Sequence, residues 1–155
     1  MEKKRKFLVV IDDTQECRVS LKYAASRAVH SGGLLTILHV VGNADFQHWL
    51  GVEAIMRDEA YENAETLMRS VLADVDEAIE LMPEIVIKQG NKLDEIIDLI
   101  KQDPAISILV LGSAVEGGGP GPLVASLANS ASETFPIPVT LVPGNLTDED
   151  IAALS

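Results

Sequence analysis

The sequence is poor in aromatic residues, cysteine and positive charge, and each shortage excludes a class of protein. Aromatic side chains make up 4% of the 155 residues, whereas 47% are hydrophobic, so any core must be built from aliphatic side chains. A single cysteine, Cys17, cannot form an internal disulfide, which is typical of a reducing cytoplasm. The 12 basic residues stand against 24 acidic ones, and a net charge of −12 disfavours binding to nucleic acid or anionic membranes.

Long apolar segments are also absent. Runs such as ILVL at 108–111 are far too short to span a bilayer, so we expect no membrane insertion. Only five apolar residues separate the basic segment 3–6 from Asp12, which argues against a secretory signal and favours a cytoplasmic location. A chain of this length can bury one core, and we expect a single domain over residues 1–155.

Apolar runs and helical patterns alternate along the chain. The runs, typical of strands buried on both faces of a sheet, occupy 7–11, 34–41, 84–88, 106–111 and 139–142. Apolar residues at helical spacing predict helices over 17–28, from about 53 to Pro83, around 96–100 after an N-cap at Asn91, and over 123–134. Gly32 would end the first helix, and Thr147 could begin a terminal helical turn. This alternation predicts a doubly wound α/β fold with a parallel sheet.

In such sheets, ligands bind beyond the carboxyl ends of the strands. Two segments are expected there: Asp12-Asp13 after the first strand, and the glycine-rich stretch that begins at Gly112 after the fourth. The glycines at 117–119 and 121 would let backbone N–H groups approach an anion at the start of the next helix. The stretch lacks a Walker lysine and a GxGxxG pattern, so a phosphate-binding loop and a plain surface connection both remain open.

Acidic pairs such as Asp12-Asp13 also hold Mg²⁺ in phosphorylatable receiver domains. A receiver needs an acceptor aspartate at the end of its third strand, where this chain has Lys88 and Gln89. The receiver interpretation is therefore disfavoured.

The histidines and the cysteine have simpler explanations than catalysis. His39, inside a predicted strand, is typical of a packed or hydrogen-bonded residue, and Cys17 lies on the apolar stripe of the first helix. His48 and Trp49 fall in a loop without a metal-ligand partner at useful spacing. No nucleophile–base pattern is present, so we expect neither a catalytic nor a metal site.

Four segments together resemble the universal stress protein family over nearly the whole chain. They are the opening strand and helix FLVVIDDTQECRVSLKYA, the second strand LLTILHVV, the fourth strand ILVLGS and the approach to the fifth, FPIPVTLVP. The resemblance implies an open five-stranded parallel sheet of Rossmann type, with strand order 3-2-1-4-5.

ATP-binding members of this family carry Gly-x2-Gly-x9-Gly-Ser/Thr after the fourth strand. The corresponding positions here are Gly112, Val115, Ala125 and Ser126, so the spacing and the hydroxyl are kept while two glycines are replaced. The resemblance implies that Asp12 and Val40 contact adenosine, and that Gly112 and Ser126 help to hold ribose and phosphates. Because of Val115 and Ala125, we expect triphosphate binding to be weak or absent, with AMP or adenosine less affected.

The resemblance also implies how the protein acts. Members commonly form homodimers by pairing their fifth strands, which here would use Val139, Leu141 and Val142. Two hypotheses stay open: a regulatory or protective dimer of the stress response that works through a protein partner, and a nucleotide-responsive module that binds ATP or AMP between Asp12 and Gly112. In neither case do we expect an efficient enzyme, although slow ATPase activity is compatible with both.

Overall fold

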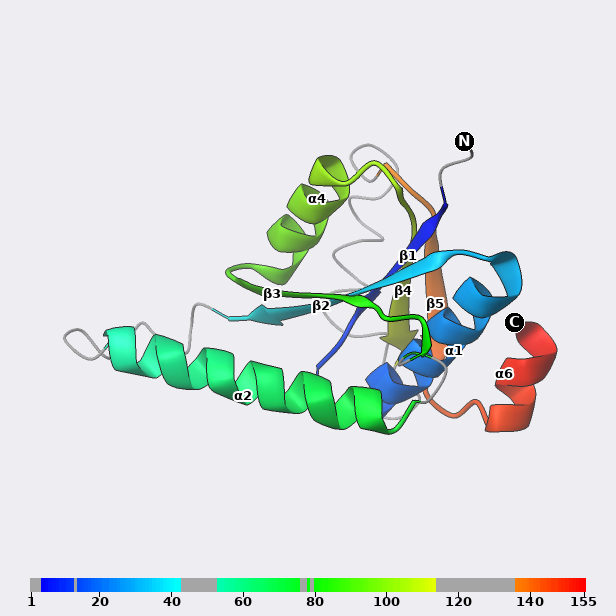
Figure 1. Ribbon diagram of the computed structural model, residues 1–155, viewed down its shortest axis with the longest axis horizontal. Coiled ribbons are helices and arrows are strands. Elements are labelled where there is room, and N and C mark those ends of the chain that lie inside the picture. Colours follow the sequence, from blue (N-terminus) through cyan, green and yellow to red (C-terminus); the bar gives the residue numbers. More distant parts are fainter. Residues whose placement is uncertain (1–3, 13, 43–52, 76–77, 79, 114–135) are drawn as a thin grey trace.

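The computed structural model describes residues 4–12, 14–42, 53–75, 78, 80–113 and 136–155 (Figure 1). The predicted helix over 123–134 lies outside these residues. In the described part of the chain, no helix is long and apolar enough to cross a membrane.

Five parallel strands form one sheet in the order β3-β2-β1-β4-β5, which confirms the predicted fold. The strands are β1 (Lys6–Val10), β2 (Leu34–Val41), β3 (Glu84–Gln89), β4 (Ile106–Ser113) and β5 (Val139–Pro143). Each pair of neighbours is parallel, and the register places Val9 of central β1 opposite Ile37 on one side and Val110 on the other. All five strands therefore end at the same edge of the sheet.

Helices cover both faces of the sheet (Figure 1). One face carries α1 (Gln15–Ser31), α2 (Glu53–Ala73) and α6 (Asp148–Leu154), and the other carries α4 (Lys92–Gln102). Alternate residues of β1 supply the two cores: Phe7 and Val9 pack toward α1, whereas Leu8 and Val10 pack toward α4. Successive side chains of a strand point to opposite faces of the sheet, and helices cover both faces. The strand sequences are therefore apolar throughout.

The predicted helix ends are confirmed by their hydrogen bonds. Gly32 ends α1 in the left-handed conformation, with φ 69°, which glycine adopts without a steric penalty. The Asn91 side chain accepts a hydrogen bond from the backbone N–H of Asp94 at 3.1 Å and so caps α4. At α6, Thr147 and Asp150 form a reciprocal capping box.

The second helix departs from the prediction. The apolar spacing predicts one helix from about residue 53 to Pro83, but α2 ends at Ala73. The backbone N–H groups of Asp74 and Val75 bond three residues back, to Val71 and Leu72, so the chain tightens into a turn. Val71 and Val75 are both buried in the same core, which explains why the apolar pattern runs on through the break.

Candidate functional site

The carboxyl edge of the sheet brings Asp12 close to residues from two other elements. Asp12 follows β1, and its Oδ1 accepts hydrogen bonds from the backbone N–H of Thr14 at 2.8 Å and from the Thr14 hydroxyl. Its Oδ2 lies 3.8 Å from the ammonium group of Lys92, at the start of α4. One carboxylate oxygen therefore fixes the entry into α1, while the other faces the partly exposed ammonium group of Lys92.

Opposing effects act on the pKa of the Asp12 carboxyl group. Its partial burial is the largest effect and would raise the pKa, but the neighbouring Cys17 thiol, Thr14 and the Lys92 charge together lower it below its usual value. Asp12 is therefore ionised at neutral pH and can only accept hydrogen bonds.

The Cys17 thiol is a neighbour of the Asp12 carboxylate and is unreactive. It is buried and lies 3.6 Å from the carbonyl oxygen of Val10, to which it donates. Burial, assisted by the hydrogen bond with Asp12 and by the Asp12 charge, raises the pKa of the thiol to about 12. The thiolate required of a nucleophile is thus disfavoured, and the predicted role of Cys17 as a buried hydrophobe is confirmed.

His39 joins β2 to the end of β1. Its Nδ1 lies 2.7 Å from the carbonyl oxygen of Ile11, which confirms the prediction of a hydrogen-bonded histidine. A carbonyl oxygen only accepts, so Nδ1 must carry the proton of this bond.

A pocket of about 500 Å³ lies between this edge of the sheet and α2. The β-strand side contributes Asp12, His39, Val40, Val41 and Gly42, and the helix side contributes Ala60, Asn63, Ala64 and Leu67. Two of the residues that the sequence predicts as adenosine contacts, Asp12 and Val40, thus line one pocket. Val40 is only 4% exposed, so it offers mainly its backbone to this space.

Gly112 packs against the first turn of α1. It lies in β4 and is not among the residues that line the pocket. A Cβ at this position would lie 2.6 Å from the carbonyl oxygen of Glu16 and 2.8 Å from its carbonyl carbon. Glycine is therefore required here by the close packing of β4 against α1, whether or not a ligand is present.

The other residues of the predicted phosphate loop lie outside the described residues. These are Val115, Ala125, Ser126 and the glycines at 117–119 and 121; Asp13, His48 and Trp49 lie outside them as well.

Sequence reasoning missed Lys92 and Asn63. Lys92 directly follows the N-cap of α4 at the carboxyl end of β3, a position that signals its approach to Asp12. Asn63 gives no comparable signal, because it is one of many polar residues on α2 and only the packing of that helix brings it to the pocket.

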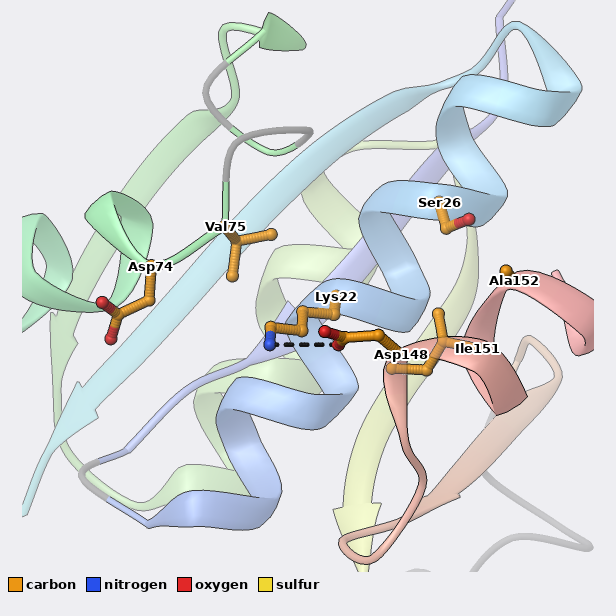
Figure 2. A pocket seen from close by; sticks show the side chains of 7 residues that line it. All are labelled: Lys22, Ser26, Asp74, Val75, Asp148, Ile151 and Ala152. Carbon is orange, nitrogen blue, oxygen red and sulfur yellow. Dashed lines mark hydrogen bonds and ion pairs between the residues drawn. The ribbon is translucent and has the colours of Figure 1, made fainter.

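A second, smaller pocket of about 250 Å³ lies between α1, α6 and the end of α2. Figure 2 shows Lys22 of α1 turned toward Asp148 of α6, and their charged atoms are 3.3 Å apart. Asp74, on the opposite side, pairs with Arg18 at 3.2 Å. Among the described residues, each charged side chain that lines this pocket already has a partner, so this pocket is a weaker candidate for ligand binding. In the described part of the chain, no three His, Cys, Asp or Glu residues are grouped to hold a metal ion.

The edge strand β5 presents a partly apolar surface. Leu141 is 45% exposed and Val139 is half-buried, whereas Val142 is 2% exposed and belongs to the core. Any contribution of Val142 to a contact between two chains must therefore come from its backbone.

Comparisons with known proteins agree with this architecture. The family model described as the universal stress protein family matches residues 4–143. A comparison with curated proteins finds no match. The solved structure of the universal stress protein UspA from Lactobacillus plantarum superposes with a TM-score of 0.70 at 17% identity, over 92% of this chain and 99% of that one.

Two further solved structures contain a nucleotide. A universal stress protein in complex with cAMP has a TM-score of 0.54 at 15% identity, over 93% of this chain and 100% of that one. The universal stress protein from Archaeoglobus fulgidus in complex with dAMP has a TM-score of 0.51 at 15% identity, over 90% of this chain and 98% of that one. At these identities the likeness demonstrates a shared fold.

Proposed function

The chain belongs to the universal stress protein family, and from this premise we propose that it is a cytoplasmic regulatory dimer of the stress response that binds an adenine nucleoside or its monophosphate. The ligand occupies the pocket between Asp12, Val40 and α2. The protein is a single domain and is not an enzyme: binding, rather than turnover, is its activity.

The observation that carries this proposal is the pocket itself. A volume of about 500 Å³ suits a nucleoside, since pockets for small molecules measure roughly 300–1,000 Å³. The pocket combines apolar walls, from Val40, Ala64 and Leu67, with an ionised carboxylate at Asp12. The Oδ2 of Asp12 suits the hydroxyl groups of a ribose, because an ionised carboxylate accepts strong hydrogen bonds.

Known ligands of similar folds support a monophosphate. The two nucleotide complexes named above contain cAMP and dAMP, and each of these ligands carries one phosphate group. In this chain the segment 112–126 has no Lys or Arg and a single carboxylate, Glu116. A triphosphate therefore gains little charge neutralisation from that segment, and efficient ATP hydrolysis lacks the cations that phosphoryl transfer requires.

Asp12→Asn tests the site. The substitution keeps an oxygen for Thr14 but removes the negative charge and one acceptor, so the affinity for adenosine and AMP should fall about tenfold or more. Isothermal titration calorimetry with adenosine, AMP and ATP measures this. Asp74→Asn is the matched control, because it removes an equivalent carboxylate outside the pocket and should leave affinity unchanged. Failure of adenosine and AMP to bind the wild-type protein, or equal binding by Asp12→Asn, would contradict the proposal.

The dimer in this proposal uses the exposed edge of β5. An uncovered edge strand with an apolar side chain favours pairing with another strand, and Leu141 is exposed there. Leu141→Lys should convert the dimer to a monomer in light scattering, while Leu154→Lys, at an exposed residue of α6, should not. A wild-type monomer in dilute solution would refute this arrangement.

A further inference from the structure

The strand β3 forms one end of the sheet, and its outer edge is uncovered in the part of the chain that the structure describes. Its strand neighbour there is β2, on one side. No residue of β3 is fully buried, whereas most residues of β2 are. Ile85 is 44% exposed, and Met82, just before the strand, is 87% exposed. An edge of this kind can pair with a further strand.

The hydrogen bonds to β2 determine which backbone groups of β3 face outward. The N–H of Gly90 donates to the carbonyl oxygen of Val41 in β2, at 2.9 Å. Backbone groups of a strand alternate in direction with a period of two, so the even-numbered residues of β3 bond to β2. The N–H and C=O groups of Ile85 and Ile87 therefore face the uncovered edge.

Two charges of opposite sign lie four residues apart on β3. The Glu84 side chain is 52% exposed and lies 3.5 Å from Lys6, whose closer partner is Asp103 at 2.5 Å. The Lys88 ammonium group has no ion pair or hydrogen bond among the described residues. Glu84 and Lys88 point to the same face of the sheet, because they are an even number of residues apart. Charges on an edge strand usually hinder pairing, but these two are complementary to each other.

Antiparallel pairing of two copies of β3 about a twofold axis at Val86 uses both features. Outward-facing residues must lie opposite each other, so the axis passes through a residue. An axis at Val86 sets Ile85 opposite Ile87 of the partner subunit, as a hydrogen-bonded pair. It also sets Glu84 opposite Lys88 of the partner subunit, in the closer kind of pair. The twofold axis repeats this ion pair, whereas an axis at Ile85 or Ile87 forms none.

We infer that β3 is a second self-association edge of this protein, through which two copies pair in the antiparallel register centred on Val86. This edge is distinct from the β5 edge proposed for the dimer, so dimers linked through β5 join into larger assemblies. Opposite charges and β-branched side chains in cross-strand pairs favour the register. Pairing over 84–88 is a small contact beside stable interfaces of roughly 1,200–2,000 Å², so the association is weak and depends on protein concentration.

Sedimentation velocity over a range of protein concentrations tests the inference. Leu141→Lys removes the contact proposed for β5, so in this background the β3 contact is measured alone. We expect a monomer in dilute solution and a dimer at high concentration. Adding Lys88→Glu or Glu84→Lys sets like charges opposite each other at two places and should weaken this dimer about tenfold or more.

Mixing the two charge variants is the decisive measurement. A chain with Lys88→Glu carries acidic side chains at both positions, and a chain with Glu84→Lys carries basic ones. Each repels its own copies, but together they should form a heterodimer, and the double variant should pair with itself. Recovery on mixing also demonstrates that the single variants are folded. Lys101→Glu mixed with Glu62→Lys is the control, because it makes the same charge changes at exposed residues of α4 and α2. These control variants should pair only as the background does.

Amide hydrogen exchange gives a readout of the register. The N–H groups of Ile85 and Ile87 face outward, so they should exchange more slowly at high protein concentration than at low. The N–H groups of Val86 and Lys88 already bond to β2 and should change little.

Three results would overturn the inference. They are a Leu141→Lys background that stays a monomer at every concentration, a dimer that Lys88→Glu leaves unchanged, and charge variants that form no heterodimer. None of them bears on the binding of adenosine or AMP. If Leu141→Lys leaves the wild-type dimer intact in dilute solution and Lys88→Glu dissociates it, β3 supplies the dimer and the contact proposed for β5 is wrong.

Discussion

Replacing Gly112 by alanine should destabilise the protein even when no nucleotide is present. The added Cβ would lie 2.6 Å from the Glu16 carbonyl oxygen and 2.8 Å from the Glu16 carbonyl carbon, well inside the usual contact distance of roughly 3.5 Å. Both atoms belong to the backbone of α1, so no side-chain rotation relieves the overlap. The helix or the strand must shift, and overpacking of this kind costs about 1–3 kcal/mol.

Thermal unfolding of the ligand-free protein measures the effect. For a chain of this size, each kcal/mol lowers Tm by about 2–4 °C, so we expect a decrease of about 2–12 °C. Gly42→Ala is the matched control. Among the described residues, a Cβ at Gly42 has no neighbour within 4 Å, and Gly42 is not one of the glycines with positive φ. The Tm of Gly42→Ala should therefore change by no more than about 1–2 °C.

The outcome separates two reasons for a glycine at this position. If Gly112→Ala unfolds at the wild-type temperature and loses only nucleotide affinity, the glycine serves the ligand and the packing argument is wrong. If the variant is destabilised without ligand, as we expect, packing of β4 against α1 is sufficient to explain the residue.

Two further predictions concern stability. Thr36 is fully buried in β2, and its hydroxyl oxygen has no partner among the described residues. Thr36→Val should therefore raise the free energy of unfolding, measured in urea, by about 1–2 kcal/mol. A decrease would show that the hydroxyl group has a hydrogen-bond partner. Asp103 accepts a 2.5 Å hydrogen bond from Lys6, which lowers its pKa against the opposing effect of burial. Asp103→Asn should therefore cost about 1–3 kcal/mol at pH 7, and the difference from wild type should close as the pH falls through the lowered pKa of Asp103. A difference that persists at low pH would mean that the charge of Asp103 is not responsible.

The strands could be predicted because several signals agree, whereas their order was implied by the resemblance to the universal stress protein family. Each strand is a short apolar run, and the helices between them carry their own end signals, such as Gly32 and Asn91. The break at Ala73 could not be predicted, because no glycine or proline marks it. Val71 and Val75 keep the helical spacing across the break, and the turn between them is set by how both reach the core.

The candidate site was predictable only in part. Asp12 follows from its position after the first strand, whereas Val40 was implied only by the resemblance to the universal stress protein family. Both residues line the same pocket. Asn63 could not be found, since its place depends on the packing of α2 over β2 rather than on a motif. A glycine required by a neighbouring helix and a glycine required by a phosphate look identical in sequence, so the packing of Gly112 against α1 could not be predicted, and its contact with a nucleotide stays a prediction.

The first turn of α1 connects the site to the packing of the sheet. The hydrogen bond between Asp12 and Thr14 forms the start of this turn. Glu16, two residues further on, packs against Gly112 of β4 and against Gly144 after β5, where an added Cβ would lie 2.8 Å from Glu16 Cβ. A substitution at Gly112 or Gly144 therefore moves the same segment that positions the Asp12 carboxylate. Loss of nucleotide binding in such a variant is evidence of ligand contact only if its Tm is unchanged. Asp12→Asn does not share this ambiguity, because it alters the atom that we propose as the ligand contact while keeping the oxygen that holds the start of α1.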